Sequence, residues 1–366
     1  MDRIRIGIIG CGTIAQIQHL PNLRELDDQF EIAAICDLSH DLLKRVGDDY
    51  GVPAGHRYSD HQALIEADID AVIVCPSGTH APATIAAAEA GKHALVEKPA
   101  CFLTDEARAM ARAAERSGVV VMIAYMKRHD PAYKFALERV RAMTDVSFVQ
   151  VNHLHPDNSL HTAEFRTHAA GDVNPDGLES LRSDTNNLID QALGLDAAPD
   201  DLRRAFTLVN GSLIHDIGNL HGMFGPPERV LSTEIWLGGR AVTTVLEYGS
   251  GVRAVLNWVD LPELYDFKET LEVYGSCERV VVSFPTGFSR GLPTRMTISE
   301  IDGEINPSKR ELEWHENSFK NELAHFGECI RDGRDPLTPA SEIIDDVALV
   351  RDIIQAWRHP TDGRDG

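Results

Sequence analysis

The sequence lacks several features that mark whole classes of protein. It has no C-x-x-C pair among its six cysteines, and no apolar run approaches the about 20 residues of a membrane span. The scattered cysteines predict reduced thiols, and the Met-Asp-Arg start shows no signal-peptide pattern, so we expect a cytoplasmic protein. Basic charge is also scarce: 35 Lys and Arg against 57 Asp and Glu give a net charge of −22, which argues against a nucleic-acid or membrane partner.

The first 125 residues alternate short apolar runs with helical patterns. Nearly continuous apolar strands separated by helices are typical of a parallel sheet covered on both faces. This pattern predicts a doubly wound α/β domain, whose ligands bind outside the carboxyl ends of the strands. The expected strands are 3–9, 31–36, 71–74, 94–96 and 119–123.

The remaining residues read differently, and a chain of 366 residues fits two domains. Strands that follow one another without helices predict an antiparallel sheet in an α+β domain. We place a nucleotide-binding domain at 1–126 and a substrate and oligomerisation domain at 127–360, with C-terminal helices that can pack back on the first domain. The expected strands are 145–154, 229–236, 241–248, 252–258, 269–274 and 279–283, and the C-terminal helices are 316–331 and 341–357.

A glycine motif follows the first predicted strand. In Gly10-x-Gly12-x-x-Ala15, Gly10 permits a tight turn, Gly12 lets the backbone approach a pyrophosphate, and Ala15 lets the next helix pack closely on the strand. Asp37 ends the second strand, where a carboxylate accepts hydrogen bonds from ribose hydroxyls and repels a 2′-phosphate. The pattern therefore favours NAD over NADP, although an aspartate there can also simply begin a helix.

A second motif, Glu97-Lys98-Pro99, follows the apolar run 94–96. Oxidation of an alcohol requires removal of the hydroxyl proton as hydride leaves carbon. An ammonium group beside the oxygen stabilises the developing alkoxide, and a nearby imidazole can take the proton. Lys98 is the candidate for the first role; Glu97 is expected to shape the site rather than to act as the base.

The chain resembles the glucose–fructose oxidoreductase / inositol dehydrogenase (Gfo/Idh/MocA) family along nearly its whole length. The glycine loop and the E-K-P element carry the resemblance, together with three further segments: 74–80, Lys127-Arg128-x-Asp130-Pro131, and a histidine-containing helix that ends at Phe224-Gly225. The resemblance implies a Rossmann domain followed by an open-faced, predominantly antiparallel sheet. It also implies that Lys98 lies beside the nicotinamide and that His215 is the proton acceptor.

The same resemblance implies a set of binding residues. Candidate substrate contacts are Arg128, His155, Asp216 and Asn219. The chain departs from the family pattern at Gly211 and Gly218, where relatives carry acids, so Asp216 is either the orienting partner of His215 or has another role. Candidate cofactor contacts are Gly10, Gly12, Thr13, Ile14, Ala15, Asp37, Cys75, Pro76, Ser77, His80, Glu97, Lys98 and Arg128.

The polar stretch 155–200 is predicted to be an insertion that lines or covers the substrate pocket, or makes a subunit contact. The histidines in and beside this stretch match no zinc pattern, and no metal is predicted; they are His153, His155, His161 and His168.

These observations favour an NAD-dependent oxidoreductase that acts on a secondary hydroxyl or ketone of a sugar, polyol or cyclitol, as a dimer or tetramer. Two alternatives stay open. One is an enzyme with tightly bound NAD that uses internal redox for glycoside elimination or hydrolysis. The other is a non-catalytic dinucleotide-sensing regulator on the same fold.

Overall fold

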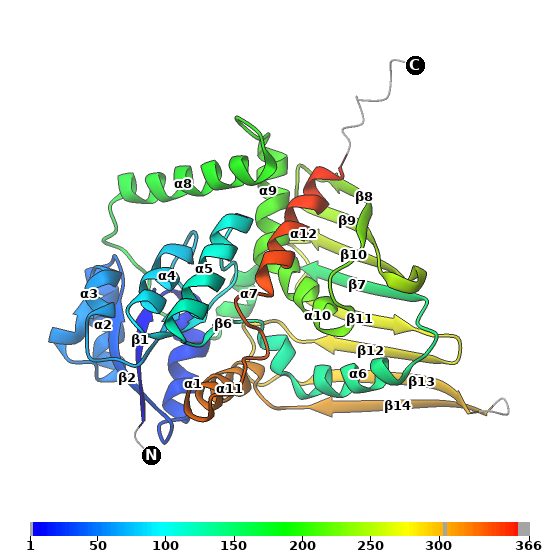
Figure 1. The fold of residues 1–366 in the computed structure, drawn as a ribbon, viewed down its shortest axis with the longest axis horizontal. Coiled ribbons are helices and arrows are strands. Elements are labelled where there is room, and N and C mark those ends of the chain that lie inside the picture. Colours follow the sequence, from blue (N-terminus) through cyan, green and yellow to red (C-terminus); the bar gives the residue numbers. More distant parts are fainter. Residues whose placement is uncertain (1–2, 303–305, 358–366) are drawn as a thin grey trace. The chain divides into compact units, whose positions relative to one another are not determined.

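The computed structural model describes residues 3–302 and 306–357 and divides the chain into two compact units (Figure 1). Unit 1 takes residues up to 126 together with 165–191 and 318–347. Unit 2 takes 127–164, 192–317 and the residues from 348 on. Both units are therefore assembled from segments that lie far apart in the sequence.

Unit 1 contains a parallel six-stranded sheet with the strand order β3-β2-β1-β4-β5-β6. Most of its strand residues are buried, because helices cover both faces of such a sheet. The strand order reverses between β1 and β4, and this reversal creates the crevice in which doubly wound sheets bind ligands. The strands are β1 (Ile4–Ile9), β2 (Phe30–Cys36), β3 (Arg57–Tyr58), β4 (Ala71–Val74), β5 (His93–Val96) and β6 (Val121–Ile123).

Helices from both ends of the chain complete unit 1. Leu323 and Phe326 of the C-terminal helix α11 join the same hydrophobic core as Ile6 and Ile8 of β1. Ser39 caps the N-terminus of helix α2, because its Oγ accepts a hydrogen bond from Leu42 N at 3.0 Å. The helices are η1 (Ala15–His19), α1 (Leu20–Glu25), α2 (His40–Tyr50), η2 (Ala54–His56), α3 (His61–Ile65), α4 (Ala81–Glu89), α5 (Thr104–Ser117), α8 (Pro175–Leu193, largely in unit 1) and α11 (Ser318–Asp332).

The segment after α11 closes the sheet at β6. Ile123 N donates to Thr338 O at 2.8 Å, and Thr338 Oγ1 donates to Ile123 O at 2.6 Å. The buried Tyr125 hydroxyl donates to Asp346 Oδ2 at 2.9 Å, near the start of α12 (Ile343–Gln355). These hydrogen bonds attach the end of the chain to the last strand of the Rossmann sheet.

Unit 2 contains an eight-stranded sheet with the order β14-β13-β12-β11-β7-β10-β9-β8. All its neighbouring strands run antiparallel except β7 and β10, which pair in parallel. The strands are β7 (Phe148–His155), β8 (Arg229–Trp236), β9 (Ala241–Glu247), β10 (Arg253–Asp260), β11 (Lys268–Tyr274), β12 (Glu278–Phe284), β13 (Thr294–Asp302) and β14 (Asn306–Trp314). The predicted fold class, a Rossmann domain plus a predominantly antiparallel sheet, is confirmed.

Helices of unit 2 carry several candidate residues. They are η3 (Met126–His129, whose first residue belongs to unit 1), α6 (Pro131–Ala142), α7 (Asn158–Thr162), α9 (Asp200–Leu208), η4 (Val209–Leu213) and α10 (Ile214–Phe224). Asp130 begins α6 by accepting from Ala132 N at 2.8 Å, and Pro131 occupies the first helical position.

Three strands were not predicted from the sequence: the two-residue β3, and β13 and β14. Strand β14 lies at the sheet edge, and most of its residues are exposed and polar or charged. Charged side chains on an edge strand discourage pairing with other chains, and they also hide the strand from a search for apolar runs.

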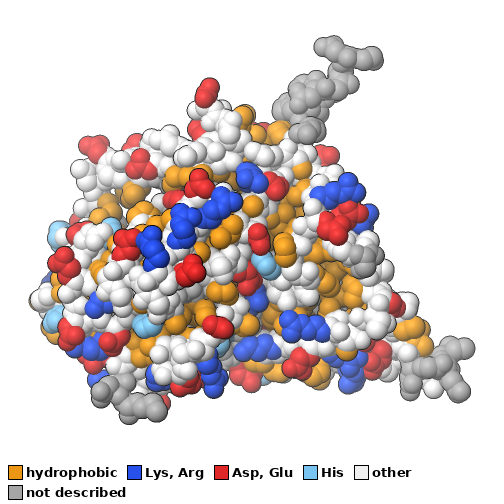
Figure 2. All heavy atoms as spheres, in the orientation of Figure 1, with side chains coloured by type: hydrophobic (Ala, Val, Ile, Leu, Met, Phe, Trp, Pro, Cys, Tyr) orange, Lys and Arg blue, Asp and Glu red, His pale blue; other side chains and the backbone are white. Residues whose placement is uncertain are grey.

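Acidic and basic side chains are interspersed on the face that Figure 2 presents. Among the described residues, no helix has the length and apolar character needed to cross a membrane.

We predict that Tyr125→Phe lowers the free energy of unfolding by about 1–2 kcal/mol, because a buried hydrogen bond to a carboxylate is lost. Urea unfolding measures the change. The matched control is Tyr265→Phe, since Tyr265 is 77% exposed and its substitution should stay within about 0.5 kcal/mol. Equal effects of the two substitutions would contradict the role given to Tyr125.

Candidate active site

The glycine loop after β1 is shaped by its contact with the end of β4. Gly10 has φ of 93°, and a Cβ on it would lie 2.6 Å from backbone atoms of Cys75 and Pro76. A Cβ on Gly12 would meet nothing within 4 Å, so open space lies beside the loop there. Ala15 is fully buried at the start of η1. The loop thus has the tight turn and the open approach that a pyrophosphate requires.

Asp37 links this loop to the start of α2. Its Oδ2 accepts from Cys11 N at 2.8 Å, and its Oδ1 accepts from Ser39 N at 2.9 Å. Each carboxylate oxygen retains a further lone pair, and the side chain is partly exposed. Asp37 is therefore able to accept hydrogen bonds from ribose hydroxyls. The residues present fit a dinucleotide: Gly10, Gly12 and Ala15 for the pyrophosphate and Asp37 for the ribose.

His80 joins the loops that follow β4 and β5. Its Nε2 lies 2.8 Å from Pro76 O and its Nδ1 lies 2.6 Å from Glu97 O, and the ring is almost fully buried. Burial lowers the pKa of His80 below its ordinary value, although the two carbonyl oxygens oppose the shift. Both ring nitrogens thus face the backbone, which makes His80 a residue that positions the loops.

Glu97 is held by an unexpected partner, His19. Glu97 Oε1 lies 2.8 Å from His19 Nε2, and Glu97 Oε2 accepts from Lys98 N at 3.1 Å. Burial opposes ionisation of Glu97, but the hydrogen bond from His19 and the nearby charges of His19 and Lys98 outweigh it, so the pKa of Glu97 is lowered. Glu97 therefore supports the backbone at Lys98. The Lys98–Pro99 peptide bond is cis, and the Lys98 side chain is partly exposed.

Glu322 of α11 is a second buried acid that the sequence did not single out. Neither carboxyl oxygen has a hydrogen-bond partner among the residues that the structure describes. Burial, and next the charge of Glu97, raise the pKa of Glu322 well above its ordinary value. Its membership of the core of unit 1 was not predictable, because its neighbours lie far away in the sequence.

In unit 2, helix α10 carries His215, Asp216 and Asn219, all buried. The Tyr133 hydroxyl donates to the Asn219 backbone carbonyl at 2.7 Å. Neither polar atom of the Asn219 side chain has a hydrogen-bond partner within the described part of the chain. A buried amide in this state is suited to a hydroxyl group of a ligand. Arg128 donates to Gly218 O at 3.3 Å, which fixes it beside the same helix.

Asp216 belongs to a buried ionic cluster that the sequence did not reveal. Its Oδ2 lies 3.1 Å from His153 Nδ1, and His153 lies 3.8 Å from Glu269 Oε1. Glu269 is ion-paired with Lys127. Burial raises the pKa of both Asp216 and Glu269, and the charge of Asp216 raises the pKa of Glu269 further, although the Lys127 ammonium group opposes both shifts. The structure thus gives Asp216 a partner on β7.

His153, Asp216 and Glu269 are placed closely enough to hold a metal ion, although none was predicted. The Lys127 ammonium group already occupies this position beside Glu269, and a cation there would repel a metal ion. His155 stacks on His153 with ring centroids 5.5 Å apart, and its Nδ1 lies 2.7 Å from Pro156 O. The fourth histidine of the stretch, His168, belongs to unit 1.

Comparison with known proteins finds a family model that matches the N-terminal part of the chain. The model of the oxidoreductase family with an NAD-binding Rossmann fold, GFO_IDH_MocA, matches residues 4–125. The Rossmann part of this chain is therefore similar to that of the Gfo/Idh/MocA oxidoreductases. This match and the relatives below support a dehydrogenase or reductase that acts on CH–OH groups.

Three similar proteins illustrate the range. The uncharacterized oxidoreductase YrbE of Bacillus subtilis (strain 168) is 24% identical over 343 residues, covering 93% of this chain and 89% of the relative. The scyllo-inositol 2-dehydrogenase (NAD(+)) of the same organism is 28% identical, but the match covers 46% of this chain and 49% of that enzyme. The 3-ketoreductase KijD10 from Actinomadura kijaniata, solved with NADP and TDP-benzene, has a TM-score of 0.72 at 19% identity and 98% coverage of both chains, which shows a shared fold.

We predict that two glycine substitutions in the loop affect different properties, namely stability for Gly10→Ala and dinucleotide binding for Gly12→Ala. Gly10→Ala should lower the free energy of unfolding by about 2 kcal/mol or more, because of its positive φ and the backbone contact. Gly12→Ala should change stability by less than about 0.5 kcal/mol, yet weaken NADH binding about tenfold or more, because the methyl group enters the pyrophosphate approach. Urea unfolding and calorimetric titration measure both quantities. Similar loss of stability in both variants, or unchanged NADH affinity in Gly12→Ala, would refute this account.

A pH-dependent prediction follows from Glu322. A carboxyl group with a raised pKa in the folded protein binds more protons there than in the unfolded chain, so stability falls as pH rises above about 4.3, by up to about 1.4 kcal/mol per pH unit. Glu322→Gln removes this titration. The stability of the unmodified protein relative to the variant should therefore decline as the pH rises above about 4.3, measured by urea unfolding at several pH values. The exposed Glu115→Gln serves as control, and parallel curves for Glu322→Gln and the unmodified protein would disprove the assignment.

Proposed function

We propose that this chain is an NAD-dependent oxidoreductase that moves hydride between a nicotinamide and a secondary hydroxyl or ketone of a sugar, polyol or cyclitol. The observation that carries the proposal is the grouping, in unit 1, of the glycine loop, Asp37 and Lys98 at the carboxyl ends of β1, β2 and β5. This edge of a doubly wound sheet is where dinucleotides and their substrates bind.

Each residue has a distinct proposed role. A bound nicotinamide dinucleotide supplies the hydride acceptor or donor. Lys98 places an ammonium group beside the reacting oxygen and stabilises negative charge on it. His215 takes the hydroxyl proton during oxidation and returns it during reduction. Glu97, held by His19, positions the backbone that carries Lys98.

The substrate contacts proposed in unit 2 suit a molecule with several hydroxyl groups. The side-chain amide of Asn219 is buried and has both a donor and an acceptor to offer. Arg128, Asp216 and His155 remain proposed contacts. A buried polar group is costly unless it is hydrogen-bonded, so a polyhydroxylated ligand that pairs with these groups is favoured over an apolar one.

The choice of NAD rests on Asp37 at the end of β2, whose carboxylate suits a free ribose 2′-hydroxyl. The proposal includes a cytoplasmic location and a homo-oligomeric state, dimer or tetramer. Both can be tested on the purified protein and in cell fractions.

The decisive experiment measures NADH formation by purified protein with NAD and a panel of sugars, inositols, sugar acids and glycosides, and then repeats it with NADP. Turnover with a polyol identifies the substrate group. Absence of turnover together with NAD that stays bound through gel filtration would replace this proposal with the internal-redox reaction on glycosides.

Lys98→Ala should lower turnover by about a hundredfold or more, because the alkoxide loses its electrostatic partner, while NAD affinity stays within about threefold. Initial rates and calorimetric titration with NAD report the two quantities separately. Lys134→Ala, which removes an exposed lysine from α6, is the control and should leave both unchanged. A Lys98→Ala variant that retains most of its turnover would show that the proposed chemistry is wrong.

A further inference from the structure

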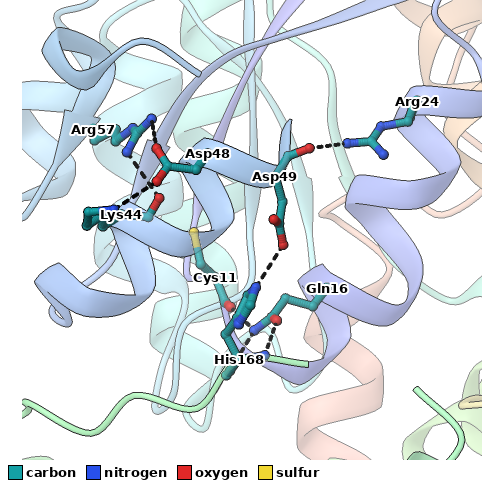
Figure 3. A network of polar contacts seen from close by, with 8 residues as sticks. All are labelled: Cys11, Gln16, Arg24, Lys44, Asp48, Asp49, Arg57 and His168. Carbon is teal, nitrogen blue, oxygen red and sulfur yellow. Dashed lines mark hydrogen bonds and ion pairs between the residues drawn. The ribbon is translucent and has the colours of Figure 1, made fainter. Parts of the chain in front are cut away.

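Residues 165–191, the part of the predicted insertion 155–200 that belongs to unit 1, include contacts with the glycine loop. His168 N donates to Gln16 Oε1 at 2.7 Å, and Gln16 Nε2 donates to His168 O at 3.0 Å and to Cys11 O at 2.8 Å. The His168 ring Nε2 lies 2.7 Å from Asp49 Oδ2 on α2 (Figure 3). One side chain, Gln16, therefore joins the backbone of the insertion to the backbone of the dinucleotide loop.

Four residues further on, Asp172 reaches the start of α2. Its Oδ1 accepts a hydrogen bond from Ser39 Oγ, and its Oδ2 accepts from Asp41 N at 3.1 Å. Ser39 is also bonded to Asp37 through its backbone N–H group. Two carboxylates, Asp37 and Asp172, thus flank Ser39 at the carboxyl end of β2, although they come from segments more than a hundred residues apart.

We propose that Asp172 is a second determinant of cofactor choice, which excludes the 2′-phosphate of NADP from the adenosine end of the site; the inference rests on the dinucleotide site proposed above. A phosphate at this position would be held by the hydroxyl of Ser39 and by the free N–H groups of the first turn of α2. Asp172 already accepts from both groups, so it occupies the hydrogen-bond donors that a phosphate needs.

Charge acts in the same direction. A phosphate monoester carries about 1.5 to 2 negative charges at neutral pH, and it would face both carboxylates. The hydrogen bonds from Ser39 and Asp41 lower the pKa of Asp172, so it is ionised at neutral pH. Lys44 of α2 and Arg57 of β3 both pair with Asp48 (Figure 3).

The neutral ribose of NAD meets no such conflict. Asp37 retains lone pairs for ribose hydroxyls, and Asp172 adds no charge to a ligand without a 2′-phosphate. The insertion thereby extends the discrimination that relatives of this fold commonly place in the single acid at the end of the second strand.

The test is direct binding of NADH and NADPH, followed by calorimetric titration or by the fluorescence of the reduced nicotinamide, without substrate. Asp172→Asn keeps an acceptor for Ser39 and Asp41 N but removes the charge. It should lower the Kd for NADPH about fivefold to tenfold and change the Kd for NADH less than about threefold. The difference should shrink at high salt, which screens exposed charges.

The matched control is Asp176→Asn, because Asp176 is an exposed acid of the same segment, in the first turn of α8. An unchanged ratio of the two Kd values in Asp172→Asn, or an equal change in Asp176→Asn, would overturn the role of Asp172. Failure of the unmodified protein to bind either dinucleotide would instead overturn the proposed function itself.

Discussion

The close approach of the ends of β1 and β4 is the constraint on which unit 1 depends. At Gly10 a side chain would enter the backbone of Cys75 and Pro76, and so the loop has the only residue that this packing admits. The strand order reverses at the same place, and the crossing helices therefore leave in different directions and expose a crevice. The strand arrangement that builds the sheet therefore also produces the crevice that can receive a ligand.

Buried charges form the second constraint, and each unit meets it with its own network. In unit 1, Glu97 pairs with His19 at the strand end that carries Lys98. In unit 2, Lys127 pairs with Glu269 near Asp216 of α10. Such groups add little net stability, because desolvation offsets their attraction. Their contribution is structural specificity. A buried ion pair is stable in few geometries, so it fixes the conformation of the backbone beside the candidate catalytic residues.

The sequence predicted whatever depends on local pattern. The buried strands of unit 1 appear as apolar runs, and the glycine loop and Lys98 appear as short motifs at the ends of those runs. Contacts between distant segments left no such trace: Glu322 in the core of unit 1, His153 beside Asp216, and Asp172 against Ser39. Strand β14 was missed for another reason, since its exposed polar residues show neither an apolar run nor a clear alternation.

The discontinuous make-up of unit 1 has a consequence for biosynthesis. The first six strands are translated well before Leu323 and Phe326 of their core and before Thr338, the partner of Ile123 in β6, which lies 215 residues further along the chain. Part of the apolar face of the Rossmann sheet stays uncovered until these residues pack on it. Contacts so distant in sequence also form slowly. The first 126 residues thus lack part of their own core, and unit 1 is completed only after residues 318–347 have been translated.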